Sequence, residues 1–293
     1  MINLKERKKG LGGSDISVAL GINPFKTAYE LYEEKTNPDH PETPENEKMR
    51  LGRYFEDPIA RLYEDVTNQI TYCSGMFTHN KHPFLIGHPD RIIPQQKKVV
   101  EIKSVGYRSQ HLWGESGSQL VPDYYYLQAA HYALVLDYDC FDIAIVVGQE
   151  EFRYYSFERD LDIDESIIEG ASRFWKDHVK KKKPPEKDYS NSGIQELIKR
   201  KHNLVSDLKI VLPDNFVEVK NKLENAKHNI KIYDEVKKES EAIILDAMGD
   251  AGIAILSDGS SFLRKRIERK AYQCKESSYV TLTLKKGASL WKD

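Results

Sequence analysis

The stretch that decides the fold is GHPDRIIPQQKKVVEIKS, residues 87–104. Two runs rich in isoleucine and valine flank the segment PQQK, residues 94–97, a pattern typical of a β-hairpin. Side chains alternate between the two faces of a strand, so Glu101 and Lys103 share one face, while the neighbouring valine and isoleucine share the other. The hairpin therefore collects polar groups on one side of an otherwise apolar strand.

The expected register of this hairpin brings two carboxylates together. If PQQK is a four-residue turn, Ile93 faces Lys98, and counting back along the ladder places Asp90 opposite Glu101. Two ionised carboxylates that lie within a few ångströms repel each other, and a divalent cation such as Mg²⁺ or Mn²⁺ relieves the repulsion. Lys103 beside such a cation would orient or deprotonate a water molecule. The competing interpretation is a surface hairpin with an ordinary salt bridge between Glu101 and Lys103.

Hydrophobic periodicity predicts a mixed α/β fold around the hairpin. A glycine turn is expected to open the first helix, with Ser14 or Asp15 as its N-cap, and Pro58 is expected to kink or interrupt a later one. Helices are predicted over residues 10–22, 26–36, 47–68, 123–137 and 162–183, and strands over residues 71–79, 83–93, 98–105, 141–148 and 152–160.

A lysine–proline segment at residues 180–185 marks the predicted domain boundary. We therefore expect a catalytic domain over residues 1–185 and an extension over residues 186–293 that serves oligomerisation, partner binding or DNA contact. Two amphipathic helices are predicted in the extension, and the second carries a heptad seam that requires a partner helix. The tail alternates like strands around the turn SDGS, and it is rich in basic residues from Gly259 onward.

Composition limits the class of protein. The 293 residues carry 44 basic and 46 acidic side chains, a net charge of −2, which excludes a uniformly basic surface but not a local basic path for nucleic acid. The three widely spaced cysteines, Cys73, Cys140 and Cys274, argue against a disulfide framework, a zinc ribbon and an iron–sulfur cluster. No stretch has the length and hydrophobicity of a membrane span, and a reducing cytoplasm is the expected location.

Five motifs in order carry a resemblance to a known family. They are GLGGSDISVALGINPFKTAYELYEEKTN, LGRYFEDPIA, FLIGHPDRI, EIKS and VPDYYYLQAAHYALV. Together they resemble the YqaJ-type viral recombinases, the branch of the PD-(D/E)XK nucleases that is similar to phage lambda exonuclease. The resemblance covers roughly residues 7–180 and implies a restriction-endonuclease-like core, with a mixed central sheet flanked by helices. The expected extension adds a helical hairpin and a β-hairpin.

The resemblance also assigns catalytic roles. Asp90 and Glu101 match the metal carboxylates, the carbonyl of Ile102 matches a backbone ligand, and Lys103 matches the catalytic lysine. Glu56 matches a helix-borne glutamate near the metals, and an ordinary acid on a helix surface is the alternative. The motif reads HPDR where relatives often have SPDG, which changes the turn after Asp90 but removes no ligand.

Further residues match the DNA-binding parts of the family. Gln128 matches the glutamine of the catalytic group, and Tyr132 lies one helical turn later on the same face; a buried structural amide is the alternative for Gln128. Ser14 matches a serine near the DNA 5′-phosphate, and Arg7 fits a phosphate-binding arginine by its spacing. A terminal charge without a role is the alternative for Arg7. Arg108 follows the lysine strand and is expected to line the same pocket.

The resemblance implies a 5′-to-3′ exonuclease on linear double-stranded DNA, dependent on two Mg²⁺ ions that Mn²⁺ can replace. It further implies a single-strand annealing protein as partner and a homo-oligomer that forms a trimeric ring around DNA. Two other functions fit the same residues: a structure-specific or site-specific endonuclease, and a DNA-end-binding module without catalysis. The intact Asp90, Glu101 and Lys103 argue against the second, because a binding module does not need them.

Overall fold

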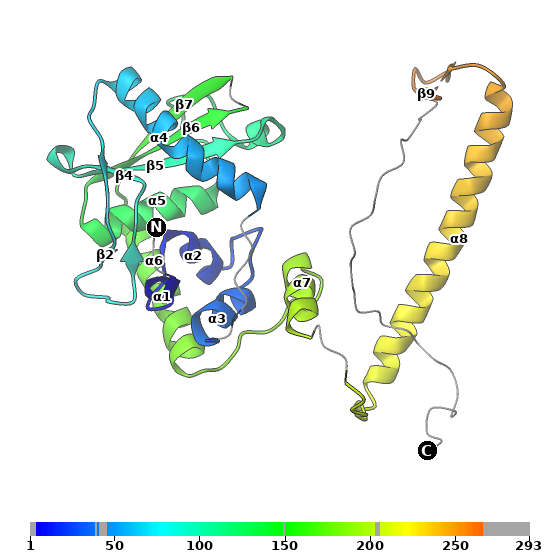
Figure 1. Ribbon diagram of the computed structural model, residues 1–293, viewed down its shortest axis with the longest axis horizontal. Helices are drawn as coiled ribbons and strands as arrows, with labels where there is room; N and C mark the ends of the chain where they lie inside the picture. Colours follow the sequence, from blue (N-terminus) through cyan, green and yellow to red (C-terminus); the bar gives the residue numbers. More distant parts are fainter. Residues whose placement is uncertain (1–3, 39, 41–45, 149, 203–205, 266–293) are drawn as a thin grey trace. The chain divides into compact units, whose positions relative to one another are not determined.

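The computed structural model describes residues 4–38, 40, 46–148, 150–202 and 206–265 (Figure 1). It divides into two compact units, Met1–His202 and Asn203–Asp293.

A mixed sheet of five strands forms the centre of the first unit. Its order is β1 (Tyr72–Cys73), β4 (Arg91–Ile93), β5 (Lys98–Val105), β6 (Cys140–Val147) and β7 (Glu151–Glu158). Only β5 and β6 run parallel, because the helix α5 (Asp123–Leu136) carries the chain back between them. The other pairs are antiparallel, so the expected mixed α/β core is confirmed.

Helices cover both faces of this sheet (Figure 1). On one face, α5 packs on the alternate residues Phe141, Ile143 and Ile145 of β6, backed by α2 (Gly13–Ala19) and α6 (Leu161–Phe174). On the other face, α4 (Glu47–Thr67) buries Ile59, Ala60 and Tyr63 against Val100, Ile102 and Ala144. β5 is thus largely apolar on both sides, as expected for a central strand, and its polar residues are Lys98 and Ser104 near its ends and Glu101 and Lys103 between them.

The two strands predicted before the hairpin are each broken in two. Residues 71–79 form β1 and β2 (Phe77–Thr78), and residues 83–93 form β3 (Ile86–Gly87) and β4. β2 and β3 pair with each other in a separate small sheet, whereas β1 and β4 belong to the central sheet. Alternation in the sequence does not show this change of sheet, because each fragment keeps the same period of two.

The N-terminal helices differ from their predicted ends. α1 spans Leu4–Arg7, α3 spans Ala28–Thr36, and α2 begins at Gly13 with Gly12 as its N-cap. Ser14 and Asp15 were the predicted caps. Instead the Asp15 carboxylate reaches back to accept a hydrogen bond of 3.0 Å from the Gly12 N–H.

Pro58 does not interrupt α4, which continues as one helix to Thr67. The proline removes the hydrogen bond to the carbonyl of Tyr54, four residues earlier. Tyr54 is exposed, so water can satisfy that carbonyl.

The first unit ends later than the predicted boundary at residue 185. After α6 come a π-helical turn, η3 (Trp175–Lys180), and the helix α7 (Ser192–Lys201). Ile194 and Leu197 of α7 pack on Tyr29 of α3, and Lys201 forms an ion pair of 3.0 Å with Glu33. The two helices expected to form a helical hairpin are therefore divided between the two units.

The second unit contains a long helix and a small hairpin in its described part. The helix α8 spans Phe216–Met248, and β8 (Ile253–Ile255) pairs antiparallel with β9 (Ser261–Leu263) around the predicted turn. The strand predicted near residues 278–286 and most of the basic tail lie outside the described residues.

No helix in the part of the chain that the structure describes is long and apolar enough to cross a membrane. Cys73 and Cys140 are free thiols, and Cys274 lies outside the described residues.

Candidate functional site

The predicted hairpin register is confirmed. Ile93 pairs with Lys98 across the turn, which is a 3₁₀ turn, η1 (Pro94–Gln96), followed by Lys97 in the left-handed region. The ladder ends at the pair of Arg91 and Val100, so Asp90 is next in line with Glu101. Beyond this pair, none of the described strands lies beside β5 on the β4 side, and the polar groups gather in that gap.

Asp90 fills the end of the ladder with its side chain. Its Oδ2 accepts a hydrogen bond of 2.8 Å from the N–H of Ile102. The N–H and C=O of one strand residue point to the same edge, so the carbonyl of Ile102 also faces the gap beside Asp90. Because β4 is short, the carbonyl of Ile102, which was predicted as a metal ligand, is not used in the β4–β5 ladder.

Glu101 is fully buried between β5 and α5. Its Oε1 accepts hydrogen bonds from Gln128 Nε2, at 2.5 Å, and from Lys103 Nζ, whereas its Oε2 is buried and has no hydrogen-bond partner among the described residues. Burial and the nearby charge of Asp90 raise the pKa of Glu101 to about 8, against the opposing effect of Lys103. A buried carboxylate oxygen without a donor is costly, so this oxygen is open to a further positive ligand.

Lys103 stays protonated in this arrangement. Burial acts to lower its pKa, but the charges of Glu101 and Asp90 outweigh burial and raise it. The ammonium group also lies 5.5 Å from the ring centre of Tyr125 on α5. Lys103 is therefore suited to neutralise negative charge and to donate a proton.

Glu56 approaches the cluster from α4, held by an arginine that the sequence prediction did not assign. Arg91 is buried, and its guanidinium contacts Glu56 Oε1 at 2.9 Å, the carboxylate of Asp57, and the Asp90 carbonyl at 2.7 Å. Burial and the charge of Asp90 raise the pKa of Glu56, although Arg91 opposes them. The sequence feature that could have indicated this contact is the arginine in HPDR, at a position where the family often has glycine.

The cluster offers oxygen donors that suit a hard divalent cation. Within the residues that the structure describes, no three His, Cys, Asp or Glu side chains are gathered closely enough to bind a metal ion as they stand. The carboxylates of Glu56, Asp90 and Glu101 nevertheless lie near enough for Asp90 to raise the pKa of both glutamates. With the free Oε2 of Glu101 and the carbonyl of Ile102, they fit Mg²⁺ or Mn²⁺ chemically.

Tyr132 joins this cluster to the N-terminal glycine turn. Gln128 Nε2 lies 3.4 Å from the Tyr132 hydroxyl, and the ring of Tyr132 packs on Gly13, directly before the exposed Ser14. Burial and the charges of Glu101 and Asp90 raise the pKa of Tyr132, so its hydroxyl remains neutral. The predicted phosphate-binding serine and the predicted catalytic glutamine therefore flank one tyrosine.

Arg7 is held near the same turn through a buried lysine. The side chain of Lys35 is fully buried, and its ammonium donates to the Arg7 carbonyl at 2.8 Å and to the Asp15 carboxylate at 2.7 Å. Arg7 itself is exposed. Arg108 is exposed in η2 (Tyr107–Leu112), and in the described part of the chain it forms no hydrogen bond or ion pair with the carboxylate cluster.

Replacing Gly13 by alanine is expected to destabilise the protein by about 1–3 kcal/mol, because the new methyl group would overpack the core. A Cβ at Gly13 would lie 2.6 Å from Cζ of Tyr132. The matched control is Gly12→Ala, where a Cβ meets no atom closer than 3.9 Å and φ is −87°. Urea unfolding of both variants checks this, and equal stabilities would contradict the packing seen at Tyr132.

Acid is expected to weaken the N-terminal unit through Asp15. Burial alone would raise the pKa of Asp15, but the charges of Lys35 and Lys26 lower it from 3.8 to about 2. The folded state therefore gains stability from this group above pH 4 and loses it as the pH falls toward 2. The free energies of unfolding of wild type and Asp15→Asn, measured across this pH range, check the effect. The free energy of the variant should fall less steeply as the pH is lowered.

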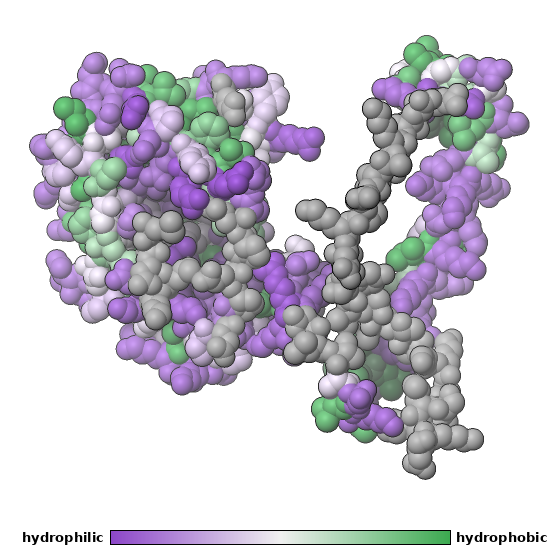
Figure 2. All heavy atoms as spheres, in the orientation of Figure 1, coloured by the Kyte–Doolittle hydropathy of each residue, from purple (hydrophilic) through white to green (hydrophobic). Residues whose placement is uncertain are grey.

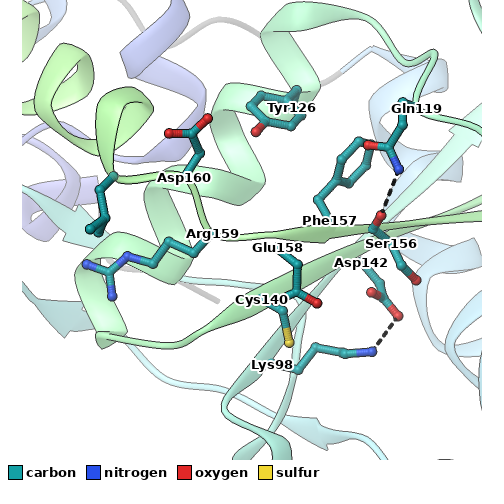
Figure 3. Close-up of a pocket in the computed structure, with 11 residues that line it drawn as sticks. Lys98, Gln119, Tyr126, Cys140, Asp142, Ser156, Phe157, Glu158, Arg159 and Asp160 are labelled. Carbon is teal, nitrogen blue, oxygen red and sulfur yellow. Dashed lines mark hydrogen bonds and ion pairs between the residues drawn. The ribbon is translucent and has the colours of Figure 1, made fainter.

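A separate pocket lies at another part of the sheet (Figure 3). Its volume is about 700 Å³, and it is lined by residues that include Lys98, Cys140, Asp142 and Glu158. Lys98 forms an ion pair of 3.1 Å with Asp142 there. None of the predicted site residues lines this pocket.

Comparisons with known proteins agree with the architecture of the first unit. Residues 4–139 match the model of the YqaJ-like viral recombinase domain. The uncharacterized protein YqaJ of Bacillus subtilis (strain 168) is 30% identical over 200 residues, which cover 67% of this chain and 62% of that protein. The chain thus spans less than two thirds of the length of this relative.

Solved structures show the same fold. The alkaline exonuclease LHK-Exo of Laribacter hongkongensis superposes with a TM-score of 0.51 at 14% identity, covering 68% of this chain and 96% of LHK-Exo. A second structure, LHK-Exo in complex with dAMP, gives the same TM-score at 15% identity, covering 95% of LHK-Exo. At this identity the likeness is one of fold. The order of motifs, the confirmed hairpin and these matches lead to one conclusion: this chain carries, in residues 4–139, a domain of the YqaJ-like viral recombinase family.

Proposed function

We propose that this chain is a metal-dependent deoxyribonuclease that degrades linear double-stranded DNA from its ends, in the 5′-to-3′ direction. The observation that carries the proposal is Glu101, a fully buried carboxylate with one oxygen that has no partner in the described part of the chain. The side chains of Asp90, Lys103 and Gln128 lie beside it. A protein that only bound DNA would not need to bury an acid at this cost. The similar fold of an alkaline exonuclease supports the same class of reaction.

We assign a separate role in the reaction to each residue of the cluster. Asp90, Glu101, the Ile102 carbonyl and Glu56 would hold Mg²⁺ or Mn²⁺, in two ions by resemblance, and bound metal would supply positive charge to the scissile phosphate. Gln128 fixes Glu101 by its hydrogen bond of 2.5 Å. Lys103, protonated and beside Glu101, neutralises negative charge that develops on the phosphate and can donate its proton.

The DNA end is proposed to lie over the glycine turn. Ser14 matches the family's serine near the 5′-phosphate, Arg7 fits a phosphate-binding arginine by its spacing, and Arg108 is proposed to line the same pocket. Tyr132 connects that turn to the catalytic cluster. By the same resemblance, the partner is a single-strand annealing protein that receives the exposed strand, and the catalytic domains assemble as a trimeric ring around DNA. Because such contacts are made to the backbone, little sequence preference is expected.

Digestion of a linear duplex tests the proposal. Duplexes with a 5′-phosphate or a 5′-hydroxyl, labelled at either the 5′ or the 3′ end of one strand, are incubated with Mg²⁺ or with EDTA. The expected result is early release of the 5′ label as mononucleotide, faster from the 5′-phosphate and absent in EDTA. Early release of the 3′ label would reverse the polarity, cutting of closed circles would indicate an endonuclease, and activity in EDTA would refute the metal dependence.

A further inference from the structure

The long helix α8 has an apolar stripe that no described residue of its own unit covers. Of its 33 residues, Phe216–Met248, only Met248 is buried. The side chain of Ile230 is 67% exposed and that of Tyr233 is 71% exposed. The stripe repeats at spacings of three and four, through heptad positions a and d, and its apolar members are Phe216, Val219, Leu223, Ala226, Ile230, Tyr233, Ile244 and Ala247. A heptad stripe of this length is the pattern of a helix that pairs with another helix.

The charges beside the stripe change sign along the helix. The four charged e positions are Lys220 and Lys227 in the first half of α8, and Asp234 and Glu241 in the second half. Lys220, Asp234 and Glu241 each form an ion pair with a residue one turn away on the same helix, for example Asp234 with Lys238 at 2.6 Å. These pairs lie at the surface, so they contribute little and do not prevent pairing across helices. The charges of one half of α8 are therefore complementary to those of the other half. Figure 2 shows the charged surface of this helix with hydrophobic side chains between.

We propose that α8 pairs with α8 of a second copy of this chain as an antiparallel coiled coil. In this arrangement, e positions face e positions, so Lys220 meets Glu241 of the second copy, and Lys227 meets Asp234 of the second copy. Two-fold symmetry makes each of these pairs twice. The partner that these charges favour is thus a second copy of α8 that runs in the opposite direction.

The same register also matches the apolar stripe. It places Ile230 beside Tyr233 of the second copy at the centre, and Phe216 beside Ala247 of the second copy at each end, so large side chains meet smaller ones. The polar a position, Lys237, comes beside Ala226 of the second copy, where the small side chain leaves room for the lysine stem to run out to solvent. The whole helix is then covered from one end to the other.

A parallel pair does not satisfy these charges. In parallel coiled coils a g position faces the next e position of the partner, which would set Lys222 against Lys227 of the second copy. The acidic e positions would face Asn229 and Val236, which carry no charge. The sequence therefore favours the antiparallel direction by attraction and disfavours the parallel direction by repulsion.

Sedimentation equilibrium of the full chain tests the pairing through the stripe. Pairing through α8 joins two copies of the chain, so Ile230→Asp should lower the mass at micromolar concentration, by half where the first unit is a monomer or a trimeric ring. The matched control is Ile232→Asp, at position c, whose side chain is 42% exposed and points away from the stripe. Circular dichroism confirms that both variants keep α8 helical. An unchanged mass for Ile230→Asp, or an equal loss in Ile232→Asp, would overturn the proposal.

A charge exchange tests the direction. Lys227→Glu should raise the dissociation constant of the pair by at least about tenfold, because two attractive contacts become repulsive. The double variant Lys227→Glu with Asp234→Lys should recover the wild-type constant, since each helix then offers the exchanged pair. Tighter association of Lys227→Glu alone would indicate a parallel pair, and failure of the double variant to recover would refute the antiparallel register. DNA digestion is measured in parallel, so a failure of the coiled coil is distinct from a failure of the proposed nuclease.

Discussion

Lys103→Ala should lower the rate of nucleotide release from linear duplex DNA by about 10²–10⁴-fold, the range that a positioned proton donor contributes. In the structure, Lys103 donates to Glu101, and the charges of Glu101 and Asp90 keep it protonated. Alanine would remove the only lysine that contacts the cluster within the described residues, and would leave Glu101 buried with Gln128 as its one hydrogen-bond donor. The loss should therefore fall on the chemical step.

Single-turnover digestion in Mg²⁺ measures this effect. The control is Lys81→Ala, an exposed lysine in the segment between β2 and β3. Gel-shift titration in Ca²⁺, with both variants, separates DNA binding from cleavage, and binding within a few-fold of wild type is expected. Equal cleavage rates for wild type and Lys103→Ala would show that the reaction takes place elsewhere.

Lys35→Met should destabilise the first unit by about 3–5 kcal/mol, the cost of removing one partner of a buried ion pair. The Lys35 side chain is fully buried, 2.7 Å from Asp15, and it also holds the Arg7 carbonyl. Methionine fills a similar volume but leaves the Asp15 carboxylate with Lys26 at 3.8 Å as its remaining cation. Because this pair joins α1, α2 and α3, the loss should unfold the glycine turn as well.

Urea denaturation gives the free energies. Lys26→Met is the matched control, since Lys26 is partly exposed and lies farther from Asp15, and it should cost about 1 kcal/mol or less. Adding Asp15→Asn to Lys35→Met should recover much of the stability, because the buried charge is then gone. A double variant no more stable than Lys35→Met would mean that packing, and not charge, explains the loss.

Local rules were enough to predict the hairpin of residues 87–104. The period of two in VVEIKS and the length of the PQQK turn determined which residues face each other, and the structure has that register. The same rules predicted the amphipathic helices α4 and α6, because each needs only a repeating apolar face to be recognised, and they also predicted the apolar helix α5. The roles of Asp90, Glu101 and Lys103 remain proposals.

Other features depend on contacts between residues far apart in the chain. Arg91 reaches Glu56 across 35 positions, and Lys35 reaches Arg7 across 28. The broken strands before the hairpin pair in two different sheets, a choice that alternation cannot express. Each of these results depends on which element lies alongside, not on the residues next in sequence.

The sequence by itself therefore determined the elements, the register of one hairpin and the family motifs. Only the tertiary structure decided that Glu101 is buried with one oxygen unpaired, that Tyr132 packs on Gly13, and that a lysine with no exposed side chain holds the N-terminal turn. The physical reason is that periodicity and turn geometry act over a few residues, whereas desolvation and charge pairing are properties of the assembled surroundings of a side chain.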